Sequence, residues 1–303
     1  MKKILLSVVC LVVLGIQSVQ AQVAIAALHH NDSVKIYSSN AIQSAVDDAV
    51  AGDTIYLSEG IFAGFTVRKP IAIIGAGQTT IISTWISLGD YHTTIESGLL
   101  LSGLNIIQSV GFYGVINGAR IMQCKINDTC GFDSSSNTSI DNIDIIMSQI
   151  GTLAPNEYVK GLTVVASKIA YISSGGADEG SVTILNCNIA RDESNKINFV
   201  NCIIPNLGSS VYTNCLYINS SSGSVIHDCY QNDFTLDDDL NCSLTDEQLK
   251  AAGYLGPNGT WVGITGGEVK FSLVTPVAQV VDHSLEVDQV ERKLKVTLKL
   301  GNK

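Results

Sequence analysis

The chain has 303 residues, of which 46% are hydrophobic and 15% charged, and its formal net charge is −10. An acidic chain is a poor partner for nucleic acid or anionic lipid, because both repel negative charge. β-Branched residues, Asn, Ser and Gly dominate while amphipathic helical periodicity is scarce, so we expect an all-β fold built from repeated strands.

Residues 1–21 have the composition of a secretory signal peptide, with Lys2 and Lys3 before an apolar run and the small-x-small motif at 19–21. The run is too short to cross a bilayer and no second one follows, so we expect no membrane span. Cys10 lies inside the run and not at the cleavage point, which argues against a lipid anchor. Removing the two lysines takes the charge from −10 to −12. We predict an exported protein in the periplasm, on the cell surface or outside the cell.

Residues 22–33 are interpreted as a lead-in to a short helix and the first strands of a coiled sheet. Asn40 is a candidate N-cap for a helix over 40–50, whose apolar residues recur at i, i+3, i+4 and i+7, and Gly52 is expected to stop it. Period-2 alternation follows, beginning with Ile55 and Leu57, in short runs separated by Gly and Pro. This order predicts a capping helix that leads into stacked strands.

Three short motifs in this region carry a resemblance, namely Ala-Gly-Asp-Thr-Ile at 51–55, Lys-Pro-Ile at 69–71 and Ile-Gly-Ala-Gly at 74–77. With them, residues 40–82 resemble the N-terminal end of right-handed parallel β-helices of the pectin-lyase-like superfamily. The resemblance implies the fold and says almost nothing about activity, because that superfamily includes lyases, hydrolases, esterases, adhesins and binding proteins.

From residue 104 to 231 the chain follows a degenerate repeat in which an Asn-Cys pair stands between two alternating apolar runs. The Asn suits a left-handed corner, and the small residue after it suits a stacked inward position. We therefore expect a single right-handed parallel β-helix over 34–240. The predicted anchors are Ser109, Cys124, Ser148, Ser167, Cys187, Cys202, Cys215 and Cys229.

The anchors lie 19 to 24 residues apart between Cys124 and Cys187 but 13 to 15 residues apart after Cys187. This change predicts narrower late rungs, where a rung is one turn of the coil. The alternative is that some Asn-Cys pairs occupy different corners of the same rung.

Without Cys10 the chain has an odd number of cysteines, so at least one is free or intermolecular. Export favours disulfides, but one cysteine per rung is typical of a packing pattern. We therefore expect buried, unreactive thiols at Cys187, Cys202, Cys215 and Cys229. No two cysteines have CxxC spacing, so we expect no zinc site.

Residues 241–303 differ in character from the repeat. Thr245 and Gln248 form a predicted capping box for a helix over 244–252, with Gly253 at its C-terminal end. Strands over 278–287 and 294–300 are expected to form a hairpin about the turn 288–292. We expect this segment to cap the open end of the coil, with the aliphatic face of 294–300 packed against the rungs or the helix. The alternative is docking to a partner or to the cell surface.

Two charged groups are weak candidates for a site. Arg191, Asp192 and Glu193 are the densest charges on the coil, and a solvated loop explains them better than catalysis. The second group, Asp237, Asp239 and Asn241, alternates as calcium ligands do. The next ligand positions carry Cys and Gln where Gly and Glu are usual, so an acidic linker explains this group better. We expect no cofactor and no metal, and the motifs of polygalacturonases and pectinesterases are absent.

The leading prediction is an exported non-enzymatic β-helix that presents a repetitive surface to a glycan or a cell-envelope protein. The alternative is a carbohydrate-active enzyme, a polysaccharide lyase or glycoside hydrolase, that acts on a neutral or weakly charged polysaccharide with Asp192 or Glu193 in an acid/base role. Two carboxylates within about 10 Å in a groove beside an exposed aromatic would favour the enzyme. The candidate aromatics are Trp85, Tyr91, Phe112, Tyr113, Tyr171, Tyr230 and Trp261.

Overall fold

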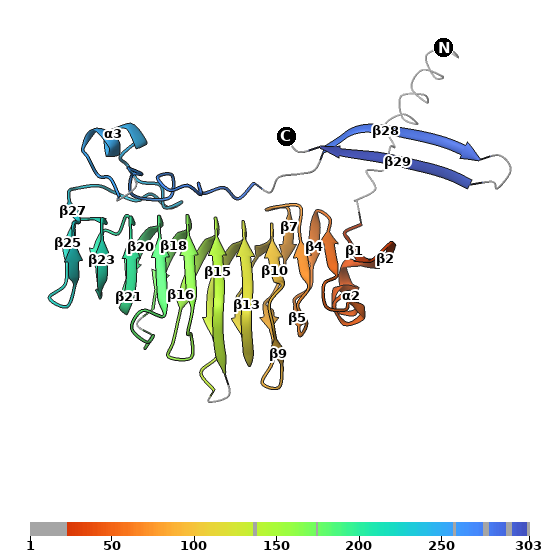
Figure 1. The fold of residues 1–303 in the computed structure, drawn as a ribbon, viewed down its shortest axis with the longest axis horizontal. Coiled ribbons are helices and arrows are strands. Elements are labelled where there is room, and N and C mark those ends of the chain that lie inside the picture. The colour runs from red at the N-terminus through yellow and green to blue at the C-terminus, as the bar shows by residue number, and fades with distance from the viewer. Residues whose placement is uncertain are drawn as a thin grey trace, which may run out of the picture.

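The computed structural model describes residues 23–135, 138–173, 175–256, 259–274, 279–288 and 293–301. Its strands stack side by side into a parallel β-solenoid, as Figure 1 shows, and the predicted all-β parallel β-helix is confirmed. Strands β21 and β23 run parallel to each other, so the late repeats belong to the same coil as the early ones.

Sheet A forms one face of the coil. All its pairings are parallel except those of β1 with β2 and β3, which are antiparallel. In spatial order its strands are β2 (Ser33–Ser38), β1 (Ile25–His30), β3 (Thr54–Leu57), β6 (Ala72–Ile74), β10 (Leu99–Ser102), β13 (Val115–Met122), β15 (Ser139–Ile146), β17 (Leu162–Val165), β19 (Val182–Leu185), β21 (Asn195–Val200), β23 (Ser209–Thr213) and β26 (Val225–His227), with β9 (Thr94–Ile95) beside β13.

Sheet B forms the other face and has two arms that meet in β14. One arm contains β4 (Gly60–Phe62), β7 (Thr80–Ile82), β11 (Asn105–Ile106), β14 (Lys125–Phe132), β16 (Gln149–Ala154), β18 (Lys168–Ile172) and β20 (Asn188–Asp192). The other contains β5 (Phe65–Val67), β8 (Ile86–Leu88) and β12 (Val110–Phe112). In the last rungs only short pairs remain, β22 (Asn206–Leu207) with β25 (Asn219–Ser220) and β24 (Leu216–Tyr217) with β27 (Tyr230–Gln231).

The N-terminal end of the coil is closed by helix α2 (Ile42–Asp48), which follows a 3-10 turn, η1 (Ser39–Ala41). The predicted cap is wrong, because Asn40 lies inside this turn and Ala41 takes the N-cap position without a side-chain hydrogen bond. The helix ends at Asp48, before the predicted residue 50. The sheet also begins earlier than the predicted boundary at residue 34, since β1 pairs directly with β3.

One edge of the coil is a column of left-handed corners. Asn186, Asn201 and Asn214 have φ of 50°, 55° and 51°, which confirms the predicted corner role of asparagine. Their backbone N–H groups each donate to the next rung, so the three pairs stack one per rung and the alternative of several corners in one rung is wrong. The same position in other rungs is held by Gly103, Gln123, Met147, Ala166 and Asp228, all with positive φ.

The predicted anchor Ser109 is wrong. The register of Asn105 with Lys125 places Leu104 below Cys124, so this inward position is not always small. Leu104 fits because the rung before it has Gly75 at the corner, where an added Cβ would lie 2.7 Å from the Leu104 side chain. The missing side chain of one rung thus makes room for the large one of the next.

The Ser and Cys anchors form a hydrogen-bonded ladder. The N–H of Ser148 donates to Ser167 Oγ (3.1 Å), and the N–H of Ser167 donates to Cys187 Sγ (3.3 Å). Each anchor also donates to the carbonyl oxygen two residues before it, as Cys187 does to Leu185 O (3.2 Å). The left-handed corner diverts these N–H groups from the β-ladder, so the anchor must be small and able to donate and accept, which Ser and Cys both are.

The separation of successive anchors falls along the coil. It is 24, 19 and 20 residues in the pairs that link Cys124, Ser148, Ser167 and Cys187. It is 14 residues between Cys215 and Cys229. The predicted narrowing of the late rungs is confirmed.

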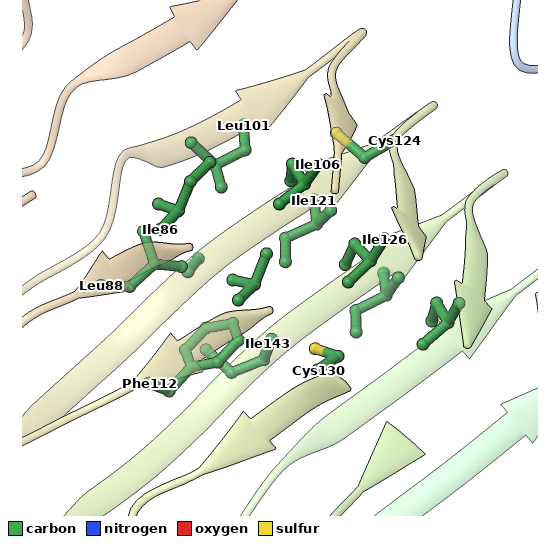
Figure 2. Close-up of a cluster of buried hydrophobic side chains, with 14 of the residues drawn as sticks. Ile86, Leu88, Leu101, Ile106, Phe112, Ile121, Cys124, Ile126, Cys130 and Ile143 are labelled. Carbon is green, nitrogen blue, oxygen red and sulfur yellow. The ribbon is translucent and has the colours of Figure 1, made fainter. Parts of the chain in front are cut away.

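The interior of the coil is filled mainly by Ile, Leu and Val, with Cys124 and Cys130 among them (Figure 2). All seven cysteines after residue 22 are free thiols, and Cys187, Cys202 and Cys215 are buried as predicted. Cys229 is only half-buried, contrary to the prediction, because it lies in the last rung. Burial raises the pKa of the Cys124 and Cys130 thiols to about 12, so both stay protonated.

Helix α3 (Asp246–Ala251) has the predicted capping box, and Gly253 follows it with φ of 74°. Leu249 packs with Ile203 and Leu216, which lie in the last rungs. The chain after the helix, residues 259–274, is called the strap and runs back along the coil (Figure 1), where Gln123 Nε2 donates to Val274 O (2.6 Å). The strap lies along the side of the coil, and the predicted cap, which includes the hairpin, stays a prediction.

Strands β28 (Gln279–Asp288) and β29 (Lys293–Gly301) form the predicted antiparallel hairpin. The predicted burial of the side chains of 294–300 lies outside what the structure describes, as does the predicted signal peptide at 1–21. Within the described ranges no helix is long and apolar enough to cross a membrane.

Candidate functional site

A groove of about 360 Å³ lies on the outer face of sheet B, in the arm built by β8, β12 and β14. Trp85 lines it with 57% of its surface exposed, together with Tyr113 and Asp133. We call it the Trp85 groove. Trp85 therefore presents the face of a large aromatic ring to this groove.

The floor of the groove follows from strand alternation. Ser87, Gly111 and Gly131 stand opposite one another in three successive strands and point outward. Their strand neighbours point inward, where Phe112 and Phe132 stack with ring centroids 4.9 Å apart. Small residues outside and large ones inside give a hollow with a packed, rigid base.

Aromatic side chains stand at both ends of this floor. Trp85 precedes β8 and Tyr113 follows β12, and because these strands are parallel the two residues flank the floor along the strand direction. The Tyr113 ring bends back over Gly111, where an added Cβ would lie 2.6 Å from Tyr113 Cε2. Tyr91 supports Tyr113 edge to face, with centroids 6.0 Å apart.

Polar groups complete the groove. Ser109 Oγ and Thr129 Oγ1 donate to the two oxygens of Asp128, at 3.1 and 3.2 Å. Asp133 accepts hydrogen bonds from Thr138 Oγ1 (2.8 Å) and from the N–H of Ser135 (3.2 Å). Partial burial opposes ionisation of Asp133, but these donors outweigh it and hold its pKa below the usual value. Asp133 is therefore an anion at neutral pH.

The carboxylates of the groove can be compared with those that glycoside hydrolysis requires. Asp133 is the one carboxylate among the described residues that line the groove. A hydrolase needs a second carboxyl group, and one of the pair must be protonated to act as the acid. The lowered pKa of Asp133 disqualifies it from that role near neutral pH.

The candidates Arg191, Asp192 and Glu193 are separated by strand alternation. Arg191 and Glu193 form an exposed ion pair beside Tyr171, whose hydroxyl donates to Glu193 at 2.6 Å. Asp192 points into the coil, is 6% exposed, and accepts from Ser194 Oγ and from the Tyr212 hydroxyl, both at 2.5 Å. Burial raises the pKa of Asp192. The three residues do not form one site.

The calcium candidates Asp237 and Asn241 are hydrogen-bonded to each other, and a lysine lies beside them. Asn241 donates to Asp237 through its backbone N–H (2.8 Å) and its side-chain amide (3.0 Å). Lys168 Nζ donates to Asn241 Oδ1 (2.7 Å), so a lysine supplies the positive charge beside Asp237 and Asp239. In the part of the chain that the structure describes, no three His, Cys, Asp or Glu side chains gather as a metal site.

The other candidate aromatics are less free than Trp85. Tyr91 is exposed but packs on Tyr113, and Phe112 is buried. Trp261 is half-buried, with Lys250 Nζ 3.7 Å from its ring centroid. Of the predicted aromatics, Trp85 and Tyr113 line the groove, but the glycine floor was not predicted. Its signal was the Gly at the middle of two short strand patterns, 110–112 and 130–132.

A second groove of about 360 Å³ lies on the outer face of sheet A. Arg120 and Asp144 line it and pair with each other at 3.0 Å. None of its described lining residues is aromatic. Its described lining therefore offers no aromatic ring on which a sugar could stack.

No family model matches this chain. Comparisons with curated proteins and with solved structures also give no match. The groove geometry is therefore the basis for the functional assignment.

Proposed function

We propose that this protein is an exported, non-enzymatic β-helix protein of the pectin-lyase-like type whose Trp85 groove binds a glycan. The exposed Trp85 at one end of a floor made by Ser87, Gly111 and Gly131 carries the proposal. A pyranose ring has an apolar face and a polar edge, which match an aromatic platform beside hydroxyls and a carboxylate. Export rests on the predicted signal peptide.

The charge around the groove favours a neutral glycan. Asp133 lines it as an anion, and Asp128 stands behind Ser109 and Thr129. The nearby cation Arg68 is already paired with Asp90, at 2.5 Å. A uronate-rich polymer would meet repulsion here, and the net charge of −10 adds to it.

The direct test is binding of the mature chain to a panel of soluble neutral and uronate-containing polysaccharides, measured by isothermal titration calorimetry. We expect binding to at least one neutral polymer, and Trp85→Ala to weaken it about tenfold or more. Tyr56→Ala is the matched control, since Tyr56 is 46% exposed on sheet A and outside the groove. The absence of binding across the panel, or equal losses in both variants, would overturn the proposal.

The enzymatic alternative predicts a different result in the same samples. A hydrolase or lyase would release reducing ends or unsaturated products from the bound polymer, and Asp133→Asn would abolish that release. We expect the polymer to remain intact after prolonged incubation.

A further inference from the structure

The two ends of the coil are finished differently. At the N-terminal end α2 and the β1–β2 hairpin lie over the first rung, and Leu28 and Ile42 are buried there. At the C-terminal end the last strand of sheet A, β26, is exposed along its whole length. Val225 is 49% exposed and Ile226 is 37% exposed.

Ile226 occupies a core position, but no described residue buries it fully. Its register partner in the rung below is Tyr212, which points into the coil and is fully buried. Ile226 therefore continues an interior column, and its exposure marks the place where the stack stops. The outer edge of β26 also has backbone N–H and C=O groups that no described strand pairs with.

The described C-terminal segment touches the last rung at Tyr230, where Tyr254 packs with ring centroids 4.9 Å apart, but it leaves β26 exposed. Leu249 packs on Ile203 and Leu216 at the side of the last rungs, and the strap then runs away to Gln123. Figure 1 shows α3 above the strands, with β25 outermost at that end of the coil.

The last rung is also nearly free of charge. Residues 219–232 contain Asp228 as their one acidic residue and neither Lys nor Arg, in a chain of net charge −10. The outermost strand at the other end, β2, by contrast carries Lys35, paired with Asp48. A central lysine on an edge strand discourages strand pairing, and β26 has none.

We propose that the C-terminal end of the coil is an interface with a second copy of this chain, in which β26 pairs antiparallel with β26 of the partner about a two-fold axis. A second copy brings the same end, with Asp228 as its one acidic residue, so one two-fold contact covers both exposed Ile226 side chains and pairs both β26 edges at once. Repulsion between two acidic molecules is smallest where each presents little charge.

The size of this end sets the strength of the contact. A flattened rung of about fourteen residues, with sheets ~10 Å apart and side chains on both outer faces, offers roughly 500 Å² per copy. Two such ends bury about 1,000 Å², which is at the lower limit for a specific interface. The dimer should therefore be reversible, with a dissociation constant on the order of micromolar.

Sedimentation velocity of the mature chain from about 1 to 200 μM tests this proposal, independently of glycan binding. We expect a reversible monomer–dimer equilibrium that Val225→Lys weakens at least about tenfold by charge repulsion across the axis. Val225 points outward and is half exposed, so this variant should keep its fold, which circular dichroism checks. Val34→Asp, on exposed β2 at the other end, is the control and should leave the dimer unchanged.

Hydrogen exchange gives a second readout on the unmodified chain. Amides of β26 should become more protected as concentration rises, while those of β2 should not. A monomer at every concentration, a dimer that Val34→Asp breaks and Val225→Lys does not, or open-ended polymers would each overturn the proposal.

Discussion

The wide rungs, residues 103–192, and the narrow rungs, residues 195–231, obey the same corner rule but differ in sheet B. In the wide rungs an inward column runs through Cys130, Leu153 and Ile172, and it ends at Asp192. There the apolar series stops, and the carboxylate accepts from the N–H groups of Ser194 (2.8 Å) and Gly208 (3.4 Å).

The coil changes width at Asp192, between β20 and β21. By accepting from the N–H groups of Ser194 and Gly208, Asp192 holds a tight turn between β20 and β21. In the rung before it, β18 ends at the register partner Ile172 and β19 begins only at Val182. The long outer face of sheet B, and with it the Trp85 groove on β8, β12 and β14, lies before the narrow rungs. On the narrow side that face is covered by α3 through Ile203 and Leu216. The Trp85 groove therefore lies on a part of sheet B that α3 does not cover.

Removal of the Asp192 carboxylate should cause the largest loss of stability at the change from wide to narrow rungs. Asp192→Ala leaves the Ser194 hydroxyl, two backbone N–H groups and the Tyr212 hydroxyl without their acceptor inside the coil. We expect a loss of about 3 kcal/mol or more in the free energy of unfolding by urea. Asp192→Asn keeps one acceptor oxygen and should lose about 1 kcal/mol. Equal stability of wild type and Asp192→Ala would refute the role assigned to this residue.

The same residue should give a pH signature. Because burial raises its pKa in the folded state, Asp192 holds its proton in the folded chain at pH values where it is already lost in the unfolded chain. Its contribution to stability should therefore fall as the pH rises from the unfolded value of 3.8 through the raised folded value. Asp192→Asn should lack this part of the slope, which urea titrations across that range can measure. A matching slope in both proteins would contradict the assignment.

Substitution of two buried cysteines should have opposite effects on stability in the corner column and in the sheet interior. At Cys187 the thiol accepts from the N–H of Ser167, so Cys187→Ser should cost under about 1 kcal/mol and Cys187→Ala about 1–2 kcal/mol. Among the described residues Cys130 Sγ has no hydrogen-bond partner. The order should therefore reverse, and Cys130→Ser should lose more stability than Cys130→Ala. Urea unfolding of the four variants measures both orders. The same order at both sites would argue against the corner ladder.

A smaller effect, confined to binding, is expected from the floor of the groove. A Cβ at Gly131 would meet Thr129 Cγ2 at 3.5 Å, an ordinary contact, so Gly131→Val should fold normally while filling the hollow. We expect glycan affinity to fall about tenfold with an unchanged melting temperature. Thr163→Val, on sheet A, is the control for an added apolar group on an outer strand. Unchanged affinity in Gly131→Val would place the glycan elsewhere.

Local patterns predicted much of this fold. The alternation at Ile55 and Leu57, the Asn corners and the α3 capping box depend on neighbouring residues, so the sequence was enough to find them. Leu104 above Gly75 could not be predicted, because it depends on which residues of two rungs become stacked.

Less of the candidate site could be predicted from local sequence patterns. Trp85 and Tyr113 were named, but their position at the two ends of one floor depends on the register of β8 with β12. Asp192 was assigned to a solvated loop because it belongs to a dense charged group that was placed in a link between two rungs. The strand alternation that turns it inward depends on its pairing with Ile172. In a solenoid, site geometry is a property of register, which a single rung does not encode.

The two tryptophans of this chain allow the central claim to be tested directly. In ¹⁵N-tryptophan-labelled protein, the indole N–H signals of Trp85 and Trp261 can be followed while a neutral polysaccharide bound by the protein is added. The Trp261 indole donates to Thr265 at 3.1 Å and lies outside the groove, so it serves as an internal control. We predict that the Trp85 signal shifts with saturation and that the Trp261 signal stays in place. A shift of Trp261 alone, or no shift of either signal under saturating ligand, would contradict the Trp85 groove as the glycan site.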